Sequence, residues 1–117
     1  MKKIYFCFVL FVAGIACNEK KNDELNRHPA HIHYSKHAEC RMECRHINDS
    51  EVKEILENGK INYGKSDLNE DACHKRYAVE GYSQSNQDIR IIVAQCNDDL
   101  TVITVIDLGR DWTCDCD

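Results

Sequence analysis

The sequence lacks any run of basic residues, any internal repeat and any second long apolar segment. Its 117 residues include 15 Lys and Arg against 20 Asp and Glu, which gives a formal net charge of −5. Proteins obtain much of their affinity for nucleic acid from Lys and Arg contacts with phosphate, so this charge argues against a nucleic-acid partner. The short length and the absence of repeats fit one small domain.

The one long apolar run lies at the start of the chain and has the layout of a bacterial lipoprotein signal. Lys2 and Lys3 precede the apolar segment 4–13, and Cys17 follows directly after small residues. A helix needs about 20 apolar residues to cross a bilayer core, so this segment suits export better than spanning. We therefore expect cleavage of the signal peptide, residues 1–16, and acylation of the new N-terminal cysteine, with palmitate among its acyl chains.

Two neighbours of the cysteine refine this prediction. Gly14 stands where lipoprotein signals usually carry Leu, so a plain secretory signal is the alternative. Asn18 follows the cysteine, whereas the sorting rule of Gram-negative lipoproteins reserves inner-membrane retention mainly for Asp. We expect a lipid-anchored protein of the outer membrane, and loss of the two signal lysines changes the net charge from −5 to −7.

Residues 17–34 are expected to form the acylated cysteine and a flexible tether. The segment 18–26 is charged and nearly devoid of apolar side chains, a composition that disfavours a packed structure. The following tract contains His28, His31 and His33, and such a tract can bind a transition metal. Because nothing in the tract fixes a coordination geometry, we favour a solvated linker that becomes extended where it meets the domain.

The domain is predicted to span residues 35–117 and to be α+β. Ser35 is a candidate N-cap for a helix over 36–45. Asn48 begins a second helix with a capping-box pattern, and Gly59 ends it. We expect these helices to form an N-terminal hairpin with one buried side, packed on a sheet.

Beyond the helices the apolar pattern changes to a period of two, which is typical of strands. Segments 76–82, 89–96 and 100–108 are rich in Val, Ile, Thr and Tyr and are separated by turn-forming residues. A shorter strand is expected at 61–63, followed by a polar loop at 64–75. Short links favour an antiparallel meander of three or four strands. The last strand is apolar on both faces, so we expect it to be central.

The opening of the domain is similar to a known family. Its motif consists of Ser35, Lys36, His37, Ala38, Arg41, Met42, Arg45, Ile47, Glu51, Val52, Ile55, Leu56, Gly59, Lys60 and Ile61. With the segments 77–81, 90–94 and 102–108, it resembles the domain-of-unknown-function family catalogued as number 4258, over roughly residues 34–108. That family has no established activity, and its order of elements is similar to that of barnase-like and toxin-type ribonucleases, a likeness of fold alone.

The likeness to ribonucleases implies three candidate catalytic residues. His37 would act as the general acid or base, and Arg41 or Arg90 would stabilise the charge that develops on phosphorus. His37 and Arg41 are one helical turn apart and can reach one site. An Arg at this spacing more often pairs with a carboxylate or covers apolar surface with its stem, so we favour a domain that is not an enzyme.

Six cysteines remain once Cys7 of the signal and Cys17 are set aside: Cys40, Cys44, Cys73, Cys96, Cys114 and Cys116. An even number in a small exported domain favours disulfides. The last two cysteines are too close together to pair without strain, and the first two are one helical turn apart. Our preferred connectivity therefore attaches the C-terminal pair to the helical pair and joins Cys73 to Cys96.

The alternative to disulfides is a metal site. Cys40, Cys44, Cys114 and Cys116 could supply four thiolates to a tetrahedral zinc ion, with His37 as a substitute ligand. Zinc ribbons usually separate paired cysteines by two residues, and these spacings differ. We therefore expect no cofactor, with zinc as the alternative. A reactive-thiol role is also disfavoured, because neighbouring aspartates raise the pKa of a thiol.

Two functions of different classes follow from these features. The first is a non-catalytic, lipid-anchored domain of the bacterial envelope that binds an unidentified protein or small ligand. The second is a secreted ribonuclease-like effector or an inactive relative of one. The net acidic charge and the lack of RNA outside the cytoplasm favour the first. Trp112, Tyr63, Tyr77 and Tyr82 are candidates for its recognition surface.

Overall fold

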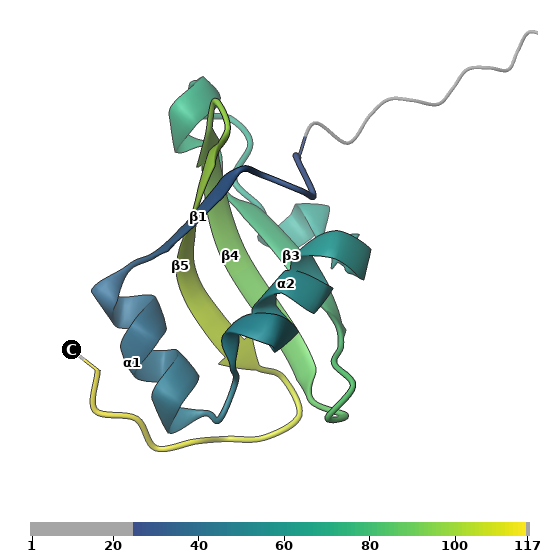
Figure 1. The fold of residues 1–117 in the computed structure, drawn as a ribbon, viewed down its shortest axis with the longest axis vertical. Coiled ribbons are helices and arrows are strands. Elements are labelled where there is room, and N and C mark those ends of the chain that lie inside the picture. Colours follow the sequence, from purple (N-terminus) through teal and green to yellow (C-terminus); the bar gives the residue numbers. More distant parts are fainter. Residues whose placement is uncertain (1–24, 117) are drawn as a thin grey trace, which may run out of the picture.

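The computed structural model describes residues 25–116, so the predicted signal and Cys17 lie outside the described part of the chain. The elements are, in order, β1 (His31–Tyr34), α1 (Lys36–Cys44), α2 (Asp49–Asn58), β2 (Lys60–Ile61), β3 (Tyr77–Tyr82), β4 (Asp88–Cys96) and β5 (Asp99–Asp107). Two short 3-10 turns, Tyr63–Lys65 and Ala72–His74, lie between β2 and β3. The predicted α+β class is confirmed (Figure 1).

The strands form one mixed sheet in the order β1-β5-β4-β3-β2. The meander of β3, β4 and β5 is antiparallel, and β2 adds to its edge in the antiparallel sense. The sheet is larger than predicted, because β1 pairs in parallel with β5, from His31 opposite Asp99 to Tyr34 opposite Val102. The expectation of a purely antiparallel sheet of three or four strands is therefore wrong.

Both helices cover the same face of the sheet, and we call the opposite face the open face (Figure 1). α1 packs against β5 and β1, whereas α2 packs against β3 and β4. The apolar side of α2, formed by Val52, Ile55 and Leu56, is buried in the core. The helices therefore divide the face between them, which corrects the predicted hairpin that would pack as one unit.

Local capping explains why the helices begin and end where the sequence predicts. The Ser35 hydroxyl accepts a hydrogen bond from the Ala38 N–H and donates to the Ile103 carbonyl at 2.8 Å, so it also ties α1 to β5. Asn48 and Glu51 form a reciprocal capping box at the start of α2. At Gly59 a Cβ would lie 2.6 Å from the Ile55 carbonyl oxygen, so only glycine fits.

The folded domain begins earlier than the predicted boundary at residue 35. Leu25 is 5% exposed and belongs to the core cluster. The Arg27 guanidinium donates through Nη1 to the Leu56 and Gly59 carbonyls at 2.9 and 2.8 Å, where it caps the end of α2. The expectation of a flexible tether is thus wrong for residues 25–34, because these residues bury apolar surface and complete the sheet.

A β-bulge changes the expected pattern of the last strand. On β4, Ile92 pairs with Thr104 whereas Val93 pairs with Val102, so Ile103 is an additional residue on β5. The side chains that face the helices therefore change from Leu100 and Val102 before the bulge to Val105 after it. A strict alternation would place Val105 on the other face from Val102, and the bulge brings both to the face that the helices cover. β5 is an inner strand between β1 and β4, and β4 is the middle strand of the five.

Candidate functional site

Three disulfides fix the irregular parts of the chain. Cys40 is bonded to Cys116 and Cys44 to Cys114, with Cα atoms 5.8 and 5.9 Å apart, and Cys73 is bonded to Cys96 with Cα atoms 4.5 Å apart. These bridges agree with the connectivity preferred from the sequence, which left open which C-terminal cysteine bonds to Cys40 and which to Cys44. All four sulfurs of the suggested zinc site are bonded to sulfur, so none is a thiolate here. Within residues 25–116, no group of three or more His, Cys, Asp or Glu side chains is arranged to hold a metal ion.

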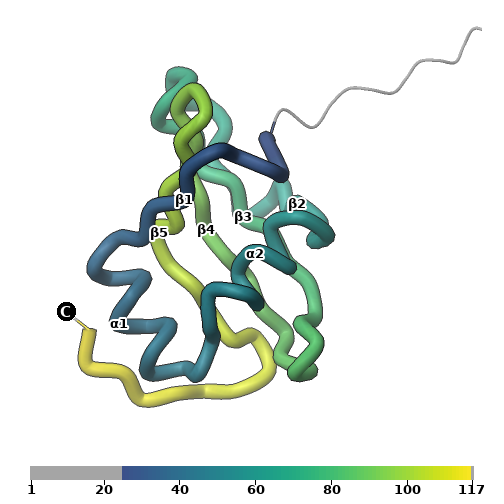
Figure 2. Tube along the Cα trace, in the orientation of Figure 1, coloured from purple at the N-terminus to yellow at the C-terminus, as the bar shows by residue number. Residues whose placement is uncertain are grey.

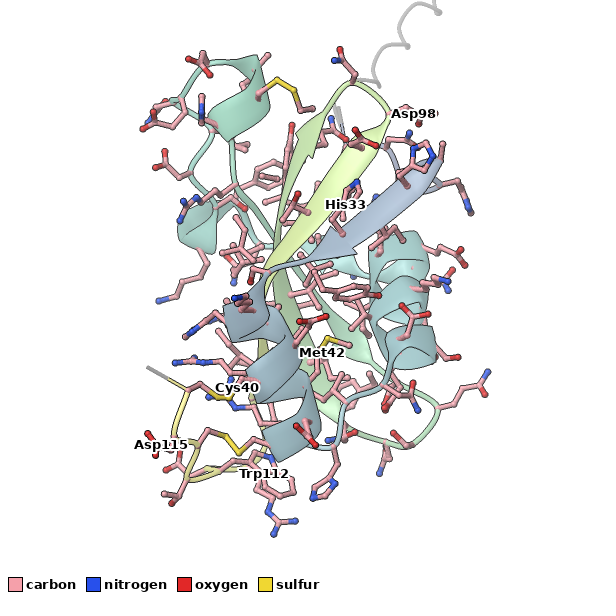
Figure 3. All side chains as sticks on the ribbon, turned by 60° about the vertical axis from the view of Figure 1, so that its left-hand side comes forward. His33, Cys40, Met42, Asp98, Trp112 and Asp115 are labelled. Carbon is pink, nitrogen blue, oxygen red and sulfur yellow. A yellow bond between two sulfur atoms is a disulfide. The ribbon has the colours of Figure 1, made fainter. Side chains whose placement is uncertain are left out.

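The C-terminal tail, residues 108–116, lies against α1. Figure 2 shows the chain leaving the end of β5, passing the end of α1 and turning back alongside it. In Figure 3 the labelled Cys40 and Asp115 lie side by side, and Trp112 lies near the end of α1. We call the Cys40–Cys116 and Cys44–Cys114 bridges together the clasp. The clasp holds the tail along one side of the first helix.

Trp112 fixes the part of the tail that precedes the clasp. Its indole Nε1 donates to Asp107 Oδ2 at 2.9 Å. The Arg110 guanidinium lies 3.9 Å from the centre of the indole ring, and the His46 ring centre lies 5.1 Å away. Burial alone would raise the pKa of Asp107, but hydrogen bonds from Trp112, the Gly109 N–H and Gln87 lower it below the usual value. Asp107 is therefore an ionised anchor for the indole.

A hollow of about 290 Å³ lies where the tail meets the end of the sheet, and we call it the tail hollow. Its lining combines two aromatic rings with polar groups: Tyr82, Asn86, Gln87, Asp88, Asp107, Gly109, Arg110 and Trp112. The Tyr82 side chain is 68% exposed. Because Arg110 and His46 already contact the indole, Tyr82 is the aromatic ring of this hollow that is open to a ligand. Tyr77, in contrast, is buried in the core.

The three candidate catalytic residues lie on different parts of the fold. His37 and Arg41 are on α1, beside β5, whereas Arg90 is on β4. Arg90 Nε donates to Glu80 Oε2 on β3 at 2.6 Å, so its guanidinium head is engaged on the side of β4 away from β5. In the described part of the chain, His37 makes no hydrogen bond or ion pair through its side chain, and the buried Nε of Arg41 has no hydrogen-bond partner.

Glu80 is the carboxylate that lies beside Arg90. Burial would raise its pKa, but hydrogen bonds from Arg90 and from Asn62, the latter at 2.9 Å, lower the pKa below the usual value. A carboxylate with a lowered pKa is a poor proton acceptor near neutral pH. The pair is therefore suited to holding β3 and β4 together on the open face, and less suited to acid–base catalysis.

A second hollow, of about 370 Å³, lies under the loop between β2 and β3. It is lined by Asp67, Glu70, Cys73, His74, Arg76, Ala94 and Ile103. The Cys73–Cys96 bridge holds this loop on the sheet, and His74 Nδ1 lies 2.5 Å from Asp71 Oδ1. Both acidic and basic side chains line this hollow. It offers no single charge that would select a ligand.

The family model described as a domain of unknown function, DUF4258, matches residues 34–107, which is more than half of the chain. The chain belongs to the DUF4258 family. Comparisons with curated proteins and with solved structures give no match.

The DUF4258 match runs from the end of β1 to the end of β5. Cys114, Cys116 and Trp112 therefore lie outside the matched span, although the cysteines bond to Cys40 and Cys44 within it. Residues 25–33 also precede the match and yet pack into the core and sheet. This chain thus surrounds its DUF4258 domain with a clasped tail and an additional parallel strand.

The disulfides also restrict the compartment in which this DUF4258 protein functions. Stable disulfides form in oxidising compartments and are rare in the cytosol. The three bridges therefore indicate an oxidising, extracytoplasmic environment. Among the residues that the structure describes, no helix is long and apolar enough to cross a membrane.

Sequence reasoning did not identify most of the residues that form the tail hollow. Trp112 was named as a possible recognition residue, but its bond to Asp107 depends on a tail that turns back beside α1. Gln87, which donates to the Arg45 carbonyl at 3.1 Å and to Asp107, looks like an ordinary turn residue in the sequence. The signal in the sequence was the aromatic residue two positions before Cys114 of the Cys-x-Cys pair, because a cysteine framework immobilises its neighbours.

Proposed function

We propose that this protein is a lipid-anchored domain of the bacterial envelope that binds a protein or small ligand at the tail hollow without catalysing a reaction. The observation that carries the proposal is the exposed Tyr82 ring beside a wall that the tail and Trp112 hold in place. Tyrosine is favoured at binding surfaces because it offers a large rigid ring and one polar group. A preformed wall also lowers the entropy lost on binding.

The position of the hollow suits a protein held at a membrane through Cys17. Leu25 and Asn26 pack near the end of β4, where the Asn26 N–H donates to Gln95 Oε1 at 2.8 Å, whereas Asp88 at the start of β4 lines the hollow. The seven residue steps from Asp88 to Gln95 separate these points by about 23 Å. The hollow therefore lies at the opposite end of β4 from the point where the chain that follows Cys17 enters the domain.

The lipid anchor has its own test. Replacing Cys17 with Ser is expected to abolish incorporation of labelled palmitate and to move the protein from the outer-membrane fraction to the soluble fraction. A Cys7→Ser variant, which changes a cysteine of the signal itself, is the matched control and should keep both label and location. Continued labelling of the Cys17→Ser variant would contradict the anchor.

A ribonuclease-like activity is the second candidate, and the open face gives it little support. The alternation of side chains along the strands places four charged residues on this face: Glu80, Asp88, Arg90 and Asp99. The second hollow, under the loop between β2 and β3, is lined by Asp67, Glu70 and Arg76 among others. Lys60, the register partner of Glu80, lies on the open face too, so charges of both signs are mixed there, and Arg90 is paired with Glu80. A surface of mixed charge lacks the concentration of basic side chains that a polyanion such as RNA requires.

Photocrosslinking in cells tests the binding proposal directly. A photoreactive phenylalanine analogue at Tyr82 should give one dominant crosslinked species, because the ring lies at the hollow. The same analogue at Tyr63 is the control, since that ring is similarly exposed, at 59%, but lies in the loop after β2. The Tyr82 species should also disappear in an Arg110→Glu variant, which changes the hollow's wall without removing a cysteine.

Two outcomes would contradict the proposal. Equal crosslinking patterns at positions 82 and 63 would show that the tail hollow is not a specific site. Degradation of RNA by the purified protein, lost in a His37→Ala variant that keeps the wild-type thermal midpoint, would replace the binding proposal with the ribonuclease.

A further inference from the structure

The first strand places two histidines of the N-terminal tract on one face of the sheet. Successive side chains of a strand point to opposite faces. Ile32 and Tyr34 pack against the core, so His31 and His33 point to the open face (Figure 3 labels His33 on β1). The parallel register sets Asp99 of β5 directly opposite His31. His31 and His33 therefore lie beside Asp99 only because β1 pairs with β5.

The carboxylate of Asp99 lies close to both rings. Its Oδ1 is 3.0 Å from His31 Nδ1 and 3.6 Å from His33 Nε2. The two ring centres are 6.4 Å apart and the ring planes differ by 27°. Each ring therefore turns one nitrogen towards the carboxylate and leaves its second nitrogen available. The side chains are 68% and 59% exposed, so the rings can adjust their torsions without disturbing the core.

We propose that His31 and His33 form a two-histidine binding site for a divalent transition-metal ion, with Asp99 as the carboxylate beside both rings. Asp99 Oδ1 lies within reach of a hydrogen bond from His31 Nδ1, at 3.0 Å, whereas its distance of 3.6 Å from His33 Nε2 is that of an ion pair. A histidine that binds a metal usually donates its other ring N–H to a carboxylate, which fixes the tautomer and makes the free nitrogen a better ligand. Imidazole nitrogen suits copper, nickel and zinc, in the order of affinity that places copper first. Two protein ligands leave the remaining coordination positions to water.

The other histidines that lie beside carboxylates provide a built-in comparison. His28 Nδ1 lies 3.5 Å from Glu57 Oε2, and His74 lies beside Asp71. Their side chains are 74% and 73% exposed, close to the values for the proposed pair. Each has a carboxylate neighbour but no second histidine two positions along a strand. The proposal therefore assigns binding to the pairing of rings and not to exposed histidine as such.

Calorimetric titration with Cu²⁺ and with Ni²⁺ tests the site. The full chain is used without a histidine tag and with free thiols blocked by alkylation, in a buffer that does not bind metal. We expect one high-affinity ion per chain, tighter for Cu²⁺ than for Ni²⁺. The His31→Ala/His33→Ala double variant should lose this binding event, and Asp99→Asn should weaken it by about tenfold. The His28→Ala/His74→Ala double variant should bind as the wild type does.

A second measurement does not depend on any variant. Paramagnetic Cu²⁺ at substoichiometric amounts should broaden the amide resonances of residues 31–33 and 99–101 before those of residues 28 and 74. Wild-type affinity in the His31→Ala/His33→Ala variant would overturn the proposal, and so would equal loss of binding in the control variant. Broadening that begins elsewhere would overturn it as well. The site lies at the opposite end of β4 from the tail hollow, so its failure leaves the proposed function unaffected.

Discussion

The C-terminal tail and the loop between β2 and β3 are both irregular segments fixed by disulfides, but they rely on them to different extents. In the loop, Asp67 and Arg76 exchange two backbone hydrogen bonds of 2.8 Å, and the Asn62 N–H donates to the Ala78 carbonyl. In the tail, as far as the structure describes it, residues 110–116 make no backbone-to-backbone hydrogen bond. The loop's disulfide reinforces an existing structure, whereas the clasp replaces the backbone bonding that the tail lacks.

Removal of the disulfides should show the largest difference between the two segments. In the chain-entropy model, the 76-residue separation of Cys40 and Cys116 corresponds to about 4.5 kcal/mol, and the 23-residue separation of Cys73 and Cys96 to about 3.4 kcal/mol. We expect a variant with alanine at all four clasp cysteines to lose more unfolding free energy than Cys73→Ala/Cys96→Ala. Urea denaturation without reductant measures both. Equal or reversed losses would contradict the comparison.

A smaller effect should follow from Trp112→Phe. This change keeps an aromatic ring but removes the donor to the Asp107 carboxylate, and a hydrogen bond to a charged group contributes about 1.5–3 kcal/mol. We expect a loss near the lower limit, because the tail stays covalently attached through the clasp. Tyr63→Phe in the loop region is the control, since its exposed hydroxyl should contribute little. The same loss in both variants would show that the indole does not fix the tail.

The smallest effect should be a pH dependence of the unfolding free energy that arises from Asp107, the residue that accepts the hydrogen bond of Trp112 in the tail. The pKa of Asp107 is lowered in the folded protein, so its contribution to stability is complete above the unfolded pKa of about 3.9 and disappears as pH falls through the lower folded pKa. The stability difference between wild type and Asp107→Asn should therefore be constant above about pH 5 and shrink below pH 4. A constant difference from pH 5 to pH 2 would contradict this assignment.

Local signals in the sequence were sufficient where the determining contacts are local. Ser35, Asn48 and Gly59 mark helix ends because their caps involve residues three or four positions away. The three meander strands follow from period-two patterns and turn residues, with bounds within one or two positions of the structure. For the cysteines, local geometry disfavoured pairing Cys114 with Cys116 and Cys40 with Cys44, and the choice among the remaining pairings was a preference.

The remaining features depend on contacts distant in sequence. The pairing of His31 with Asp99 joins positions 68 residues apart, and nothing in the short first strand identifies its partner. The alternation of side chains along the β5 sequence does not reveal the bulge at Ile103. The bulge is seen only in the register between β4 and β5. For the candidate site, the sequence named Trp112 and Tyr82 but not the hollow between them, because the tail reaches it only through a covalent return to α1.

The position of the Cys40–Cys116 bridge also determines how the domain carries mechanical force. A pull on the N-terminal end acts first on Leu25 and Arg27 and then on the pairing of β1 with β5. When the chain is pulled between its two ends, extension beyond Cys40 is impossible while the bridge is intact, because the load then passes through sulfur directly to Cys116. The helices and strands between these two cysteines are bypassed. Most of the fold, including β3 with Tyr82, is therefore shielded from tension applied between the two ends of the chain.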